Sequence, residues 1–221
     1  MRKLHLLAVV VLILAALPAI PSAFDPQAET KSVDRVDLPA PNRTGGMTLT
    51  EALAMRRSVR AFAETKLTQQ ELSQLLWAAQ GITDDKGHRT APSARAQYFL
   101  HLYLATADGF CEYLPAGHKL QRLSTKDLRA GLSSQTAVAT APAVFVITGD
   151  YDRAIQGGRE TGLRWVNLEA GHAAQNLLLQ ATALHLAAVP VGGIQPEQVA
   201  QATSLPASST PIYLIPVGHA K

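Results

Sequence analysis

The stretch that most constrains the fold is residues 162–186, GLRWVNLEAGHAAQNLLLQATALHL. It is rich in leucine, alanine and other small residues, and only Arg164 and Glu169 carry a formal charge. This composition predicts one long helix. A helix that is apolar nearly all round is buried, often against a partner. We therefore expect a fold organised around one long, largely buried helix.

Apolar segments on both sides of this helix predict β-strands. Residues 98–106, YFLHLYLAT, are followed by ADG and then by FCEYL, which is the pattern of a hairpin. Residues 141–151, APAVFVITGDY, form a continuous apolar run, which is typical of a strand covered on both faces. Further strands are predicted at AAVPVGGI, which runs into a glycine loop, and at PIYLIPVG near the C-terminus.

Two shorter helices are predicted from capping boxes, in which a threonine and a glutamate three residues later exchange hydrogen bonds. Thr48 with Glu51 and Thr68 with Glu71 fit this pattern. The expected helices cover 48–57 and 68–81. Two weaker patterns predict a short helix in STKDLRAGL, capped by Ser124 or Thr125, and another that begins at Pro196.

These elements combine into an α+β domain with a mixed sheet layered by helices. Residues 24–47 are rich in proline, glycine and charge and lack periodicity, which predicts an extended lead-in segment. The domain is then expected over 48–221. With 221 residues, 47% of them hydrophobic, the chain can bury one substantial core and needs no second domain.

The N-terminus has the pattern of a secretory signal peptide over residues 1–23. A basic start is followed by an apolar run from Leu6 to Leu17 and by small residues around Ala19 to Ala23. We expect an exported, periplasmic protein. The alternative is an uncleaved membrane anchor, although the apolar run is shorter than the ~20 residues that span a bilayer.

The remaining composition narrows the function. Loss of Arg2 and Lys3 with the signal peptide leaves 18 Lys and Arg against 17 Asp and Glu, a formal charge of +1, which argues against nucleic acid as a partner.

Cys111 is the only cysteine and lies in an apolar stretch, so a buried, inert thiol is expected. Glu169 and His172 have a spacing that can ligate metal. With no third ligand nearby we expect no metal site, and favour a buried hydrogen-bonded pair.

AMRRSVRAF, residues 54–62, concentrates Arg56, Arg57 and Arg60 within five positions. Cations are stabilised at a helix C-terminus, so the segment could be a solvated helix end. Guanidinium groups also form charge-assisted bonds to phosphate, and Ser58 adds a hydroxyl donor. Composition alone leaves both interpretations open.

Six motifs taken together resemble the nitroreductase-type flavoprotein family, and within it the SagB-type dehydrogenase branch. The resemblance runs in order from about residue 49 to 219. Its motifs are RRSVRAF, RTAPSARAQYFLHLYLAT, CEYLPAGHKLQRL, APAVFVITGDYDR, RWVNLEAGHAAQNLLLQATALHLAAVPVGGI and PIYLIPVGH.

This resemblance implies a nitroreductase-like α/β/α sandwich that dimerises through long helices and holds FMN in clefts at the interface. It implies that the FMN phosphate is bound by Arg56, Arg57, Ser58 and Arg60. The loop beside the flavin ring would contribute Pro92, Ser93, Ala94 and Gln97, and the backbone facing the ring would be that of Pro190, Val191, Gly192 and Gly193. The end of the C-terminal strand would bring a basic residue back toward the phosphate, either His219 or Lys221.

The sequence departs from the family pattern at two positions. Arg95 stands where the branch commonly has glycine, so a bulky cation enters the cleft and changes which substrate fits. His185 also replaces a usual glycine. The acidic residue that some members carry near VPVGG is absent, which leaves that flavin contact to the backbone.

The expected function is that of an FMN-dependent oxidoreductase, a homodimer that carries hydride from a reduced donor such as NAD(P)H to a small acceptor such as a nitroaromatic or a quinone. Donor and acceptor share one cleft, so the kinetics would be ping-pong, and the flavin rather than a catalytic side chain would carry the chemistry. One alternative is a SagB-like dehydrogenase or oxidase acting on a small molecule or a peptide azoline. A different class of alternative is an exported flavin-binding redox carrier without turnover.

Overall fold

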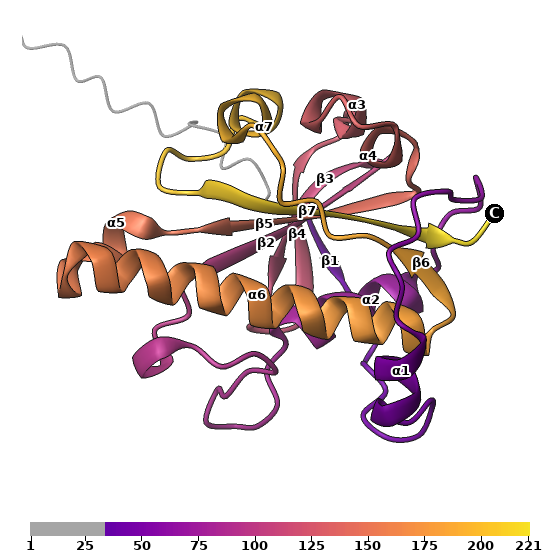
Figure 1. Cartoon of the computed structure of the whole chain (residues 1–221), viewed down its shortest axis with the longest axis horizontal. Helices are drawn as coiled ribbons and strands as arrows, with labels where there is room; N and C mark the ends of the chain where they lie inside the picture. Colours follow the sequence, from indigo (N-terminus) through magenta and orange to yellow (C-terminus); the bar gives the residue numbers. More distant parts are fainter. Residues whose placement is uncertain (1–33) are drawn as a thin grey trace, which may run out of the picture. The chain divides into compact units, whose positions relative to one another are not determined.

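The computed structural model describes residues 34–221, and this part of the chain is built around one seven-stranded sheet (Figure 1). The strand order is β1-β4-β3-β2-β5-β7-β6. The strands are β1 Arg35–Asp37, β2 Leu100–Thr106, β3 Gly109–Leu114, β4 Lys119–Ser124, β5 Ala143–Gly149, β6 Leu186–Ala188 and β7 Thr210–His219.

Helices cover both faces of the sheet, which confirms the α/β/α sandwich. The helices are α1 Leu49–Met55, α2 Gln69–Gln80, α3 Arg129–Leu132, α4 Thr136–Thr140, α5 Tyr151–Ala154, α6 Arg159–Ala183 and α7 Pro196–Thr203. Two 3-10 turns, η1 Ala94–Ala96 and η2 Ile155–Gly157, complete the set. The long helix α6 lies with α2 on one side of the sheet, and α3, α4 and α7 lie on the other (Figure 1).

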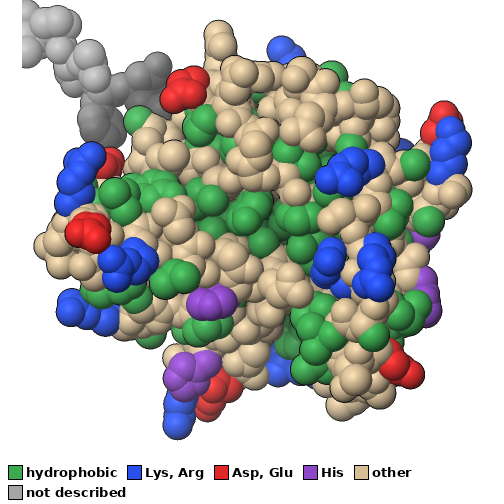
Figure 2. Space-filling model, viewed as in Figure 1, with side chains coloured by type: hydrophobic (Ala, Val, Ile, Leu, Met, Phe, Trp, Pro, Cys, Tyr) green, Lys and Arg blue, Asp and Glu red, His purple; other side chains and the backbone are tan. Residues whose placement is uncertain are grey.

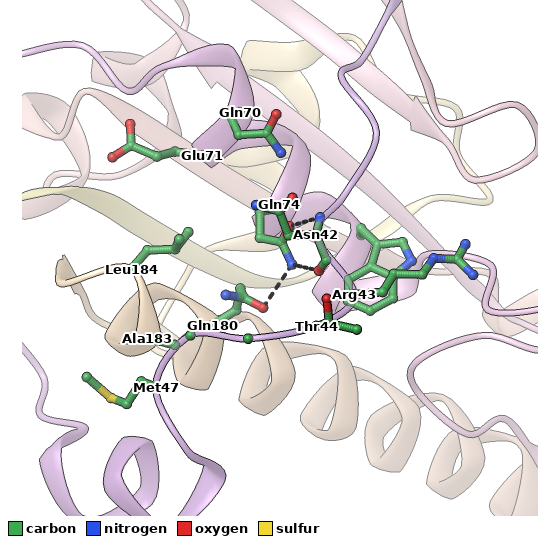
Figure 3. Close-up of a pocket in the computed structure, with 13 residues that line it drawn as sticks. Asn42, Arg43, Thr44, Met47, Gln70, Glu71, Gln74, Gln180, Ala183 and Leu184 are labelled. Atoms are coloured by element: carbon green, nitrogen blue, oxygen red, sulfur yellow. Dashed lines mark hydrogen bonds between the residues drawn. The ribbon is translucent and has the colours of Figure 1, made fainter.

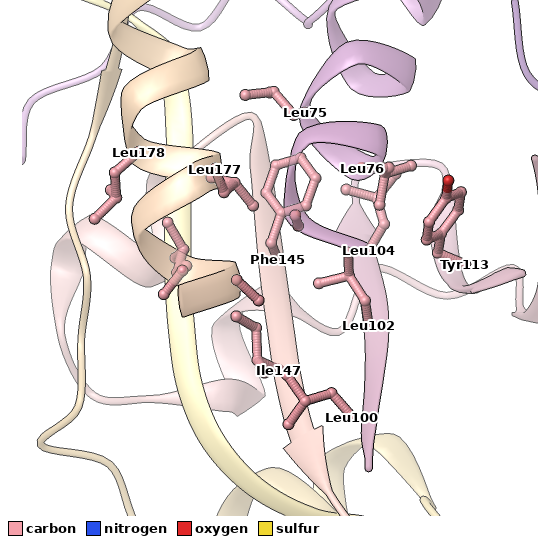
Figure 4. Close-up of a cluster of buried hydrophobic side chains, with 14 of the residues drawn as sticks. Leu75, Leu76, Leu100, Leu102, Leu104, Tyr113, Phe145, Ile147, Leu177 and Leu178 are labelled. Carbon is pink, nitrogen blue, oxygen red and sulfur yellow. The ribbon is translucent and has the colours of Figure 1, made fainter. Parts of the chain in front are cut away.

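The core divides into two layers because successive side chains of a strand point to opposite faces. In β5, Phe145 and Ile147 pack with Leu75 of α2 and Leu177 of α6 (Figure 4). Val144 and Val146 of the same strand pack in the second layer, with side chains from α3, α4 and α7. Every residue of β5 is buried, which confirms the prediction of a strand covered on both faces.

The sheet is antiparallel in all six of its strand pairs, whereas we expected a mixed sheet. β5 and β6, which α6 connects, do run parallel to each other. They are not neighbours, because β7 lies between them and pairs antiparallel with both. The parallel element is a single bridge between Ser58 and Ala188.

The second half of the segment expected as an extended lead-in belongs to the folded domain. β1 pairs with β4 along Arg35–Asp37, and Gln74 of α2 holds Asn42 by two hydrogen bonds to its backbone. The helix cap expected at Ser124 or Thr125 is wrong, because Ser124 ends β4 and the short helix α3 begins at Arg129.

The signal-peptide prediction over residues 1–23 lies outside the described residues. Among residues 34–221, no helix has both the length and the apolar character that a membrane span requires.

Candidate functional site

The arginine segment leaves α1 as extended chain and runs beside β6. Thr48 and Glu51 form the predicted capping box at the start of α1, and the helix ends at Met55, just before Arg56. Ser58 then bridges to Ala188 of β6, and the N–H of Val59 donates to the carbonyl of Ala188 at 3.0 Å. This pairing carries the segment to the edge of the sheet.

The three guanidinium groups of this segment are not equivalent. Arg57 donates to the carbonyls of Ala54 and Arg56 at 2.9 and 2.8 Å, so it caps the exposed end of α1. From Asp34 onward, the side chains of Arg56, Ser58 and Arg60 make no hydrogen bond and no ion pair with another residue. Their donors are therefore available to an external anion.

The glycine loop after β6 lies next to this segment. Val191 bridges to Leu214 of β7, with N–H···O distances of 2.8 and 3.1 Å, and Pro190 stands between that bridge and β6. Gly192 and Gly193 are exposed, and within the described chain their N–H groups donate to no other group. A Cβ on Gly192 would come within 3.2 Å of the Tyr213 ring, whereas one on Gly193 would meet open space. The loop thus presents free backbone donors on an open surface.

The C-terminus returns to the same edge of the sheet. The N–H of Ala63 donates to the carbonyl of His219 at 2.9 Å, and Phe62 bridges to Ala220. The His219 ring lies 3.7 Å from a carboxylate oxygen of Glu71, and Lys221 is exposed beyond it. Three segments that were predicted from separate motifs, 56–60, 190–193 and 219–221, therefore meet at one edge.

The fourth predicted segment, Pro92–Gln97, lies elsewhere. It forms the turn η1 against the N-terminal half of α6, where a cavity of about 250 Å³ is lined by residues of the loop and of α6. The lining residues are Pro92, Ser93, Ala94, Trp165, Leu168, Glu169 and His172. Arg95 is exposed, and its guanidinium stands over the Trp165 ring at 5.1 Å from the centroid. The Gln97 side chain donates to the carbonyl of Arg95 at 3.5 Å.

Glu169 and His172 do not form the expected buried pair. His172 is exposed, whereas Glu169 is 1% exposed and accepts a hydrogen bond from Ser93 Oγ at 2.5 Å. Burial raises the pKa of this carboxyl, and the hydrogen bond from Ser93 opposes the rise. The Ser93 hydroxyl therefore donates to Glu169, which lines the same cavity, and is not a free donor.

Within one chain, the loop and the sheet-edge segments lie toward different ends of α6. The loop lines a cavity with Trp165 and His172, whereas α1 lines another with Asn176 and Ala183. The midpoints of these two regions of α6 are about 11 residues apart, or ~16 Å at 1.5 Å per residue. Figure 1 shows α1, β6 and the C-terminus toward one end of α6 and the η1 loop below its other half.

A second cavity lies beside the lead-in, and sequence reasoning missed it. It has a volume of about 300 Å³ and is lined by the loop 42–47, α2 and the end of α6. Gln74 donates to Gln180 Oε1 at 3.2 Å, and the Arg43 guanidinium stands 5.9 Å from the Trp77 ring (Figure 3). Residues 42–47 have no periodic pattern from which this cavity could be predicted.

Two further sequence hypotheses concern thiol and metal chemistry. Burial raises the pKa of the half-buried Cys111 thiol, which disfavours the reactive thiolate. No group of three or more His, Cys, Asp and Glu side chains that could hold a metal ion occurs in residues 34–221.

The fold and this site define a class of protein: an α/β/α sandwich that sets unpaired guanidinium groups beside an exposed glycine loop, ready for an anionic ligand. The sequence profile of the nitroreductase family matches residues 53–219. The chain belongs to the nitroreductase family, as the six motifs predicted. It is therefore an oxidoreductase, of a family whose members act on small-molecule substrates and are often dimers.

Individual relatives agree with this assignment. A proposed nitroreductase of Methanocaldococcus jannaschii is 36% identical over 181 residues, which cover 77% of this chain and 90% of the relative. The crystal structure of a proposed nitroreductase from Ralstonia eutropha is 32% identical, with a TM-score of 0.80 over 85% of this chain and 90% of that one. A chain of the Escherichia coli microcin synthetase McbBCD complex shares the fold at 21% identity, with a TM-score of 0.68 over 94% of this chain and 85% of that one.

Proposed function

We propose that the protein is an FMN-dependent oxidoreductase that transfers hydride from a reduced donor to a small acceptor such as a nitroaromatic or a quinone. The observation that carries this proposal is the meeting of unpaired donors at one sheet edge. Arg56, Ser58 and Arg60 belong to the segment that pairs with β6, and Gly192 and Gly193 follow β6; within residues 34–221 neither set of donors has a partner.

These residues fit FMN in their chemistry. A phosphate takes charge-assisted hydrogen bonds from guanidinium and hydroxyl donors, and those of Arg56, Ser58 and Arg60 are uncommitted. The glycine loop lets a flat ring come close to the main chain, because no side chain projects from Gly193 into the open space beside it. When bound, FMN supplies the redox chemistry, and the protein supplies binding, orientation and electrostatics. One cleft that admits donor and acceptor in turn gives ping-pong kinetics.

A homodimer would complete the site. Large hydrophobic side chains are exposed on α1 and α6, including Leu49 at 66%, Leu53 at 55% and Leu168 at 54%. Figure 2 shows hydrophobic side chains at the surface on this face of the molecule, with Lys and Arg beside them. The Pro92–Gln97 loop and the arginine segment lie against different parts of α6, and we propose that a flavin held by the dimer takes them from two subunits. Burial of these apolar side chains would drive the association.

Arg95 gives the acceptor a chemical preference. Its guanidinium makes no ion pair with a carboxylate in the described part of the chain and lies over Trp165 beside the apolar wall of the 250 Å³ cavity. We propose that it receives the anionic group of a planar acceptor, with Trp165 as the stacking surface. An Arg95→Ala variant should then raise KM for a nitrobenzoate about tenfold and leave KM for neutral nitrobenzene unchanged.

Export is proposed from the signal-peptide pattern of residues 1–23. An exported enzyme would meet little NAD(P)H, so its reductant in the cell would be a different compound. The donor is therefore the part of the reaction that most needs a direct experiment.

The proposal is tested by the visible absorption spectrum of the purified protein, recorded anaerobically before and after addition of NADH or NADPH. A flavin band that bleaches, and then returns on addition of a nitroaromatic or a quinone, supports the reductase. Bleaching that only oxygen reverses would favour an oxidase of the SagB type, and a band that no donor bleaches would favour a redox carrier. The absence of any flavin band after supplementation with FMN would overturn the proposal.

A further inference from the structure

Glu169 is an unusual residue at its position. It is one of few charged residues along α6, and it is 1% exposed among apolar neighbours such as Val166, Ala170 and Ala173. A carboxylate in such a place is unfavourable unless hydrogen bonds compensate for the lost water. Its contacts therefore bear directly on why the fold retains it.

The carboxylate ties three parts of the chain together. Oε2 accepts from Ser93 Oγ at 2.5 Å and from the N–H of Phe99 at 3.3 Å, and Oε1 lies 3.4 Å from the Gln80 amide of α2. Ser93 Oγ in turn accepts from the N–H of Tyr98 at 2.8 Å. Glu169 thus holds both ends of the loop 93–98 at once.

The backbone between those two ends is strained. Arg95, Ala96 and Tyr98 have φ values of 54°, 54° and 49°, a left-handed conformation that residues other than glycine adopt at a cost. Such strain persists only where surrounding contacts fix it. Besides Glu169, the contacts on this loop include the Arg153 guanidinium, which donates to the carbonyls of Gln97 and Tyr98 at 3.1 and 2.6 Å.

We propose that Glu169 is a positioning residue that, through Ser93, locks the loop 93–98 in its left-handed conformation and so presents Arg95 over Trp165. This role of Glu169, called the lock below, concerns only the conformation of the loop 93–98 and not the reaction. Its consequence for the reaction, that Glu169 fixes the place where an anionic acceptor binds, rests on the proposed function.

The lock is tested by limited trypsin digestion of the full purified chain, because trypsin cleaves after the exposed Arg95 once the loop is released. Lys86, in the preceding exposed turn, gives an internal reference site. Mass spectrometry measures the ratio of cleavage at Arg95 to cleavage at Lys86. We expect Glu169→Ala and Ser93→Ala to raise this ratio at least tenfold. Glu169→Gln, which keeps an acceptor oxygen for Ser93, should stay within threefold of the wild type.

The matched control is Leu178→Ala, which removes buried atoms from the same helix away from the loop. This variant should leave the ratio within twofold of the wild type. If Glu169→Ala does not fold, Ser93→Ala and Glu169→Gln carry the test. A ratio in Ser93→Ala no higher than in Leu178→Ala would overturn the lock, and so would an equal rise in all variants.

A kinetic measurement separates the lock from the proposed function. If both are right, Ser93→Ala raises KM for a nitrobenzoate about as much as Arg95→Ala does, and the two effects do not add. A protein that has no reductase activity but shows the digestion pattern would keep the lock and refute the proposed function. If the protein has reductase activity but Ser93→Ala has the digestion ratio of the wild type, the proposed function stands and the lock is refuted.

Discussion

Two arginines are predicted to carry most of the cofactor affinity. Within residues 34–221 the guanidinium groups of Arg56 and Arg60 have no partner, whereas Arg57 is engaged at the end of α1. At ~1.5–3 kcal/mol for a hydrogen bond to a charged group, loss of both should weaken FMN binding at least ~100-fold. We expect the Arg56→Ala/Arg60→Ala double variant to be purified without flavin, as measured by the absorbance ratio at 450 and 280 nm.

The control for this experiment removes a surface arginine outside the site. Arg164 pairs with Glu160 on the exposed side of α6, so Arg164→Ala should retain its flavin. Near-identical circular dichroism of the two variants would show that the fold is intact. Full flavin occupancy in the double variant would refute the phosphate assignment.

The buried carboxyl of Glu169 predicts a pH dependence of stability. Burial raises its pKa above the ordinary value of 4.5, against the opposing effects of Ser93 and Arg89. A raised pKa in the folded state means that the stabilising contribution is complete at acid pH and is lost as the pH rises through the raised value. The free energy of unfolding of the wild type, relative to Glu169→Gln, should therefore fall as the pH rises from 4 to 7.

Urea denaturation of both proteins at several pH values measures this difference. A difference that does not change with pH, or that grows toward neutral pH, would contradict the raised pKa.

At the level of residues, the sequence predicted the environment of a side chain better than its hydrogen-bond partner. It indicated that Glu169 is buried and hydrogen-bonded, but it paired the carboxyl with His172 because the two share a helix. The actual partner, Ser93, lies 76 residues away in sequence. Only the packing of the loop against α6 brings the two together, and no local pattern encodes that packing.

Among the elements, those with a strong local pattern were predicted and those defined by pairing were not. The capping boxes of α1 and α2 and the apolar run of β5 are local features, and all three are confirmed. β1 is a short edge strand and β4 lies between it and β3; both carry polar residues such as Asp37 and Lys119, and β1 is defined by its pairing with β4. Edge strands of this kind need little apolar sequence, so hydrophobic periodicity does not find them.

The cap of α2 is predicted to matter more to stability than the cap of α1. Thr68 and Thr48 make the same hydrogen bonds, but α2 packs in the core whereas α1 is mostly exposed. Thr68→Ala should lower the free energy of unfolding by ~1 kcal/mol, a typical loss for an N-cap. Thr48→Ala should cost less, because fraying of α1 exposes little buried surface. Urea denaturation of the two variants, with Thr68→Ser as the conservative control, measures the difference; equal losses would contradict this ranking.

For the whole molecule, the sequence named the segments expected to touch the flavin, but it did not indicate how these segments are placed in one chain. Motif order carries no distance, and in the fold the η1 loop lies against residues 165–172 of α6 whereas α1 lies near residues 176–183. The long helix with few charges nevertheless indicated a partner, since some of its apolar side chains remain exposed in the single chain. Leu163 and Leu168 are 36% and 54% exposed.

This separation predicts that FMN binding depends on the dimer. A charged residue in an apolar interface is strongly unfavourable, so Leu49→Glu on α1 and Leu163→Glu on α6 should each shift the protein toward monomers. Each should also lose flavin in proportion to the loss of dimer, although every predicted contact residue is intact. Leu123→Glu on β4, 45% exposed and on neither of these helices, is the matched control and should keep both dimer and flavin. Sedimentation velocity recorded at 280 and 450 nm measures both quantities in one experiment. Monomers that sediment with full flavin absorbance would mean that one chain suffices, and the loop Pro92–Gln97 would then have to be removed from the proposed binding site.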